Sequence, residues 1–137
     1  MILYILDINK RIKKTIIIYF LITIFLIIFD RVYSLFSHGV SSLSMNLMFL
    51  YPLLGGVVVY YILGYLSKNK KNSMIISFNI YNSGIAILTV GSLLKGIMDI
   101  AGTSSEYIKY YLIIGIFFVC TSIIMFIKSI YNQYSWM

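Results

Sequence analysis

The chain has 137 residues, enough for one domain, but its composition excludes an ordinary soluble protein. Hydrophobic residues make up 61% of the chain and charged residues 11%, and the mean hydropathy is +0.94. The formal net charge of +7 comes from short basic clusters beside apolar runs. This arrangement favours anionic lipid head groups over nucleic acid as the partner, so nucleic-acid binding is not expected.

Four apolar runs follow one another along the chain, and each predicts a helix that spans a membrane. The first begins at Thr15 after a basic cluster and is not followed by a cleavage pattern, so we expect it to be retained. Residues 15–29 alone would rise only ~22 Å, and the helix must therefore continue to about residue 36. The other helices are expected at about residues 47–66, 74–95 and 106–128. The preceding residues 1–9 are expected to lie along the membrane surface as a short interfacial segment.

These runs predict an all-α, integral membrane four-helix bundle that forms a single transmembrane domain over residues 1–137. Short connections favour an antiparallel, up-down-up-down order. Eight Lys and Arg residues fall on the side with both termini and the 2–3 connection, against three on the other side. The bias predicts a multi-pass protein of the cell membrane with its N- and C-termini in the cytoplasm.

Small and polar residues mark the expected contacts between helices, because association in lipid depends on close packing and interhelical hydrogen bonds. The polar residues of the third run are expected to face protein, and glycines seven residues apart suit a seam with the fourth run. The predicted packing residues are Asn79, Asn82, Ser83, Gly84 and Gly91 in the third run and Gly115 and Ser122 in the fourth.

Pro52 lies in the second run and removes one backbone donor, so we expect a kink in the outer half of that helix. Two interpretations of the kink remain open. It belongs to ordinary helix packing, or it opens a small pocket under the outer surface of the membrane.

The candidate ligand site consists of ionisable residues near the outer ends of the first and third helices. Such groups are costly at this depth unless they are paired or face a wet cavity. Arg31 can instead reach the interface, and Asp30 can pair with Lys95 to fix helix packing. The candidate residues are Asp30, Arg31, His38, Lys95 and Asp99.

Two local patterns predict helix ends near this site. His38 precedes Gly39, which indicates a histidine in the last turn of the first helix and a glycine that terminates it. Thr103 and Glu106 have the spacing of a capping box at the start of the fourth helix. His38 could alternatively act as an acid, a base or a single metal ligand.

Motifs for catalysis and cofactors are not found in the sequence. It contains no phosphate-binding glycine loop, HExxH or GxSxG pattern. One histidine and the lone Cys120 allow neither a disulfide nor a recognisable metal site within one protomer. We therefore predict no catalytic residues, metal or cofactor.

Three functional hypotheses follow. The leading one is a small membrane subunit or accessory protein that binds another membrane protein or a second copy of itself. The alternative is a protomer of a small-molecule transporter or channel with an outward-facing polar site. The third is a membrane enzyme that acts on a lipid or lipid-linked substrate through His38 and a nearby carboxylate.

Overall fold

The computed structural model describes residues 2–38, 40–66 and 75–134, and over these ranges it is helical without strands. Four of its segments are long and apolar enough to cross a membrane: Lys10–Phe36, Leu43–Leu63, Ile76–Ile100 and Ile108–Ser129. Its elements, in chain order, are α1 (Ile2–Phe36), α2 (Leu43–Asn46), the π-helix η1 (Tyr51–Val58), α3 (Val59–Leu66), α4 (Ile75–Ile100) and α5 (Ile108–Tyr134).

Helix α1 begins at Ile2, so the expected separate segment at the N-terminus is instead continuous with the first apolar helix. The residues before Thr15 contain neither Pro nor Gly, and extending an existing helix is easier than nucleating a new one. With 35 residues, α1 is about 52 Å long at ~1.5 Å per residue. It is therefore longer than the ~30 Å hydrocarbon core of a bilayer.

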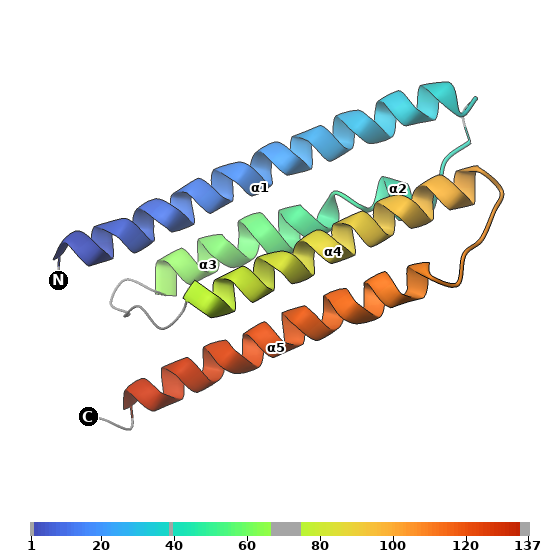
Figure 1. The fold of residues 1–137 in the computed structure, drawn as a ribbon. Helices are drawn as coiled ribbons and strands as arrows, with labels where there is room; N and C mark the ends of the chain where they lie inside the picture. The colour runs from blue at the N-terminus through green and yellow to red at the C-terminus, as the bar shows by residue number, and fades with distance from the viewer. Residues whose placement is uncertain (1, 39, 67–74, 135–137) are drawn as a thin grey trace.

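The helices lie side by side, with the first and last helices on opposite sides of the others (Figure 1). Helix α1 packs against η1 and α3, whereas α4 packs against α2, η1 and most extensively α5. Among the described residues, the backbones of α1 and α5 do not approach each other. The N-terminal end of α1 and the C-terminal end of α5 lie at the same end of the molecule (Figure 1).

Pro52 lies at the start of η1, within the segment Leu43–Leu63, which we call the second span. The expected disturbance takes the form of the four-residue helix α2, a turn and the π-helix η1, rather than one continuous helix. The proline has no amide proton for the carbonyl four residues back, whereas the next amide, of Leu53, donates to the oxygen of Phe49 at 3.1 Å. Beyond the proline, Gly56 lies so close to the Tyr19 ring that a Cβ atom there would overlap it.

The seam between α4 and α5 is built from glycines and serines. A Cβ atom on Gly84 would lie 3.1 Å from the carbonyl oxygen of Gly115, and one on Gly91 would lie 2.8 Å from Cβ of Tyr111. The buried hydroxyl of Ser122 donates to the backbone oxygen of Ser77 at 2.7 Å. The two helices thus approach until backbone meets backbone, which is how small residues associate helices in lipid.

Two of the polar residues expected to face protein have no neighbouring helix within the described residues. Asn79 and Ser83 are exposed, and the Ser83 hydroxyl donates to the Asn79 backbone oxygen within the same helix. The seam with α5 and the contact with the second span occupy other faces of α4. Asn79 and Ser83 therefore remain on the outward side, together with Ala86.

Both expected helix ends differ from the structure. His38 lies beyond the end of α1 and itself has a φ of 56°, the left-handed conformation that was expected of Gly39. Gly39 lies outside the described residues. At the start of α5, the hydroxyl of Ser105 accepts from the amide of Tyr107 at 3.3 Å. Because α5 begins at Ile108, Ser105 is near enough to cap it, and the predicted capping pair of Thr103 and Glu106 is wrong.

Candidate functional site

A cavity of about 460 Å³ lies between the irregular second span, α4 and α5, and we call it the α2–α4 groove. Its wall on the second span is mostly apolar. Its polar lining comes from two serines, one lysine and one tyrosine. The apolar residues of that wall are Leu43, Leu47, Leu50 and Leu54, and the polar residues are Ser44, Tyr51, Ser92 and Lys95.

Asp99 holds the start of α2 against α4. The hydroxyl of Ser42 donates to Oδ2 of Asp99 at 2.8 Å, and that of Ser44 donates to the same atom at 3.4 Å. Ser42 is buried and also caps α2, since its Oγ accepts from the Ser44 amide at 3.2 Å. About two turns earlier on α4, the Ser92 hydroxyl donates to the backbone oxygen of Ser44 at 2.7 Å. These bonds fix one end of the groove.

Lys95 lines the groove and is exposed. Over the described ranges, no ion pair joins a lysine or arginine nitrogen to a carboxylate oxygen within 4.0 Å, so the expected pair of Asp30 and Lys95 is not formed. The reason is geometric. Asp30 belongs to α1, which packs against the second span, and the backbones of α1 and α4 are not in contact.

The five candidate ligand residues are not gathered around one cavity. Lys95 lines the α2–α4 groove, and Asp99 orders the serines at its end. Asp30 is half-buried on α1, whereas Arg31 and His38 are exposed, and none of these three lines the groove. In the part of the chain that the structure describes, no three His, Cys, Asp or Glu side chains are close enough to hold a metal ion.

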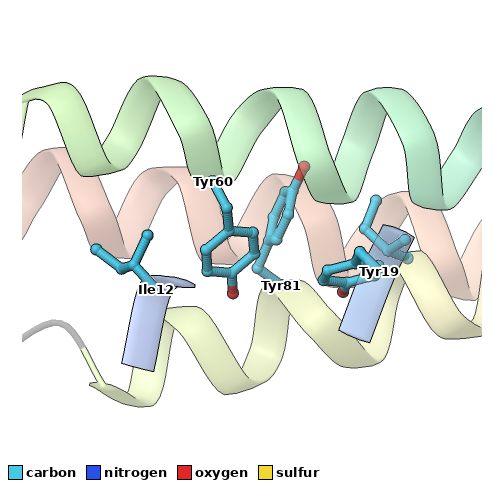
Figure 2. Packing of buried hydrophobic residues seen from close by; sticks show 5 residues of the cluster. Ile12, Tyr19, Tyr60 and Tyr81 are labelled. Carbon is cyan, nitrogen blue, oxygen red and sulfur yellow. The ribbon is translucent and has the colours of Figure 1, made fainter. Parts of the chain in front are cut away.

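A second polar cluster lies deeper between the helices, and Asn82 is its one residue that was predicted to mediate helix packing. The hydroxyls of Tyr19 and Tyr60 both donate to Oδ1 of Asn82, at 2.8 and 2.7 Å. The Tyr81 hydroxyl donates to the backbone oxygen of Gly55 at 2.6 Å, within the π-helix. Figure 2 shows the three tyrosine rings, which come from α1, α3 and α4. The cluster therefore ties α1 to α4 across the second span.

The tyrosines could have been found from sequence by one signal. A buried tyrosine hydroxyl must find a partner, and the partners in lipid are other helices. Tyr19, Tyr60 and Tyr81 each stand inside an apolar run, at a distance from the interfaces where tyrosine is common. Because tyrosine is classed as hydrophobic in a composition, the need of each buried hydroxyl for a hydrogen-bond partner is easily missed.

An apolar cavity of about 520 Å³, the α1–α4 groove, lies beside this cluster. Its two sides are α1 and α4, and Pro52 of η1 contributes to its lining. Asn82, Ala86 and Val90 line it from α4. The α1–α4 groove forms because the backbones of α1 and α4 remain apart and the two helices are joined by the Tyr19 hydroxyl.

No protein-family model, curated protein or solved structure matches this chain.

Proposed function

We propose that the protein spans the cell membrane four times as an antiparallel up-down-up-down bundle, with both termini in the cytoplasm. The four apolar helices support the crossings, and the excess of Lys and Arg beside both termini and in the 2–3 connection supports the orientation. Most large hydrophobic side chains of α1 and α5 are exposed, as lipid-facing residues would be.

Within this arrangement we propose that the protein is an accessory subunit, which assembles with another membrane protein or with a second copy. The observation that carries the proposal is the outward side of α4. Asn79, Ser83 and Ala86 are all exposed there, at spacings of four and three residues that place them on one face. Small and polar residues at such spacing are typical of helix contacts in membranes and are uncommon on surfaces that face lipid.

The side-chain amide of Asn79 explains why this face needs a partner. Its side chain has no hydrogen bond within the described residues, and α4 carries it inside the segment Ile76–Ile100. An amide left unpaired in hydrocarbon is unfavourable, whereas a neighbouring helix can accept and donate to it. The α1–α4 groove continues this face through Ala86 and offers space for the apolar side chains of the same neighbour.

The test is the mass of the assembly after extraction in a mild detergent. Wild-type protein is expected to migrate as a complex, either with itself or with a co-purifying membrane protein. Ala86→Phe adds a bulky ring to the exposed face of α4 and leaves the seam with α5 unchanged. Because the ring would prevent close approach of a neighbouring helix, association is expected to weaken at least tenfold. Ile124→Phe is the matched control, because Ile124 is 66% exposed on α5. A wild-type protein that is monomeric and alone in native mass measurements would refute the proposal.

The transporter and enzyme hypotheses have less support from the geometry. A transport site requires charged residues that face one cavity. Of the five expected residues, only Lys95 lines the α2–α4 groove. An enzyme would require a carboxylate or hydroxyl beside His38, and among the described residues the His38 side chain makes no hydrogen bond.

A further inference from the structure

The charge balance of the α2–α4 groove is incomplete within the described residues. Lys95 is the charged residue in its lining. The nearest acidic residue along α4 is Asp99, but its carboxylate accepts hydrogen bonds from Ser42 and Ser44 and lies more than 4.0 Å from the lysine ammonium. The groove therefore presents a positive charge whose counter-ion is not supplied by the described chain.

The hydroxyls near Lys95 are already committed as donors. Ser44 donates its proton to Asp99, and Ser92 donates its proton to the backbone oxygen of Ser44. The hydroxyl of Tyr51, which also lines the groove, has no hydrogen bond to the described residues. A ligand in the groove would thus meet two available donors, the ammonium of Lys95 and the phenol of Tyr51, and both suit an anion.

The rest of the groove suits a hydrocarbon chain. Leu43 and Leu47 line it from α2 and the following turn, and Leu50 and Leu54 continue the same wall along the second span. Its volume of about 460 Å³ lies within the range of ~300–1,000 Å³ that small-molecule sites occupy. A soluble anion would satisfy Lys95 but would leave the leucine wall uncovered, whereas the apolar side chains of a partner helix would cover the wall and leave the charge unpaired.

We propose that the α2–α4 groove binds one anionic phospholipid, with its phosphate on Lys95 and an acyl chain along the leucine wall. The site requires that the protein lie in a membrane, but it does not require the partner proposed for the face of α4. The two proposals can therefore fail independently, because lipid binding is measured on each protomer and assembly is measured by mass.

The test is lipid retention by the full chain, reconstituted in vesicles of equal parts dioleoyl phosphatidylglycerol and dioleoyl phosphatidylcholine. The protein is extracted in a mild detergent, and native mass spectrometry gives the ratio of the two lipids that remain bound. Lys95→Gln is expected to lower the preference for phosphatidylglycerol about tenfold, the ratio that follows from ~1.5 kcal/mol for one hydrogen bond between charged groups. Lys109→Gln is the matched control, because Lys109 is exposed at the start of α5 and does not line the groove.

A second variant fills the apolar part and leaves the charge unchanged. Leu47→Trp is expected to reduce retention of both lipids at this site, whereas Leu35→Trp, at a position 83% exposed on α1, is expected to retain them. Circular dichroism establishes that each variant keeps its helices, and Lys95→Gln decides alone if Leu47→Trp does not fold. Adding soluble glycerol 3-phosphate separates a lipid site from a site for a free anion, since it should not displace a lipid held by its chain.

Three results would overturn the proposal. Lys95→Gln and Lys109→Gln could give the same lipid ratio, which would mean that the charge in the groove does not select the lipid. Leu47→Trp could retain lipid as wild type does, which would place the bound lipid elsewhere. Glycerol 3-phosphate could displace phosphatidylglycerol at equal concentration, which would assign the site to a soluble anion.

Discussion

Replacing Gly84 by alanine tests the close approach of α4 and α5. The added Cβ atom would lie 2.8 Å from Cγ2 of Val119, 3.0 Å from its backbone nitrogen and 3.1 Å from the carbonyl oxygen of Gly115. Two of these three atoms belong to the backbone of α5, which cannot rotate aside as a side chain can. The substitution must therefore push the two helices apart.

The size of the effect follows from two opposing contributions. Alanine is a better helix former than glycine by about 1 kcal/mol. Forcing an extra carbon into a packed contact costs about 1–3 kcal/mol. Gly84→Ala should therefore lower the free energy of unfolding by up to about 2 kcal/mol. Separation of the helices also weakens the hydrogen bond from Ser122 to Ser77, at the same seam.

Gly55→Ala is the comparison that isolates the backbone contact. Its added Cβ atom would lie 2.6 Å from Cδ1 of Ile85, the far end of a flexible side chain that can change rotamer. The same gain in helix propensity offsets the cost of moving the end of the Ile85 side chain. Gly55→Ala should therefore leave the free energy of unfolding nearly unchanged. Both variants are unfolded by titration with sodium dodecyl sulfate in mixed micelles, and far-ultraviolet circular dichroism follows the loss of helix. A Gly84→Ala variant that is as stable as Gly55→Ala, or more stable, would refute the proposed backbone contact.

Two further predictions concern the buried polar cluster and the orientation. Asn82→Leu removes the acceptor shared by two tyrosine hydroxyls and should lower the free energy of unfolding by about 1–2 kcal/mol in the same titration, at ~0.6 kcal/mol or more per interhelical bond. Asn79→Leu, on the exposed face, should leave monomer stability unchanged, and equal effects at the two positions would contradict the hydrogen-bond argument. For the orientation, Cys120→Ser supplies a background without cysteine. In intact cells a membrane-impermeant maleimide should label Ser104→Cys at once and Lys10→Cys only after permeabilisation, and the reverse pattern would place the termini outside.

The sequence predicts where the helices lie better than it predicts which side of each helix faces its neighbours. Long apolar runs indicate four spans because the length needed to cross a bilayer leaves few alternatives. The direction of a side chain depends on which neighbour each helix meets, which spacing alone does not determine. Asn79 and Asn82 are three residues apart in sequence, yet Asn79 is exposed while Asn82 accepts two hydrogen bonds. Their difference arises from the position of the second span and α1 around α4.

The candidate site was predicted in part. Charge and depth drew attention to Lys95 and Asp99, and both lie at the α2–α4 groove. The partner of Asp99 could not be predicted, because Ser42 is brought to it by the packing of α2 against α4, which residue spacing does not determine. Pro52 predicted an irregular helix, but the choice of a π-helix over a simple kink requires knowledge of the neighbouring helices.

Over the described residues α1 and α5 are not in contact, and this divides the structure into two helix pairs. Each pair is continuous in sequence, and the pairs meet where α2 and η1 lie on α4, with the backbone of Met45 against Gly96. In the membrane arrangement that we propose, the early pair can therefore insert and pack before the later one is synthesised. Chains cut within the connection between them, into residues 1–70 and 71–137, would still carry both faces of that contact and could reassemble inside a bilayer.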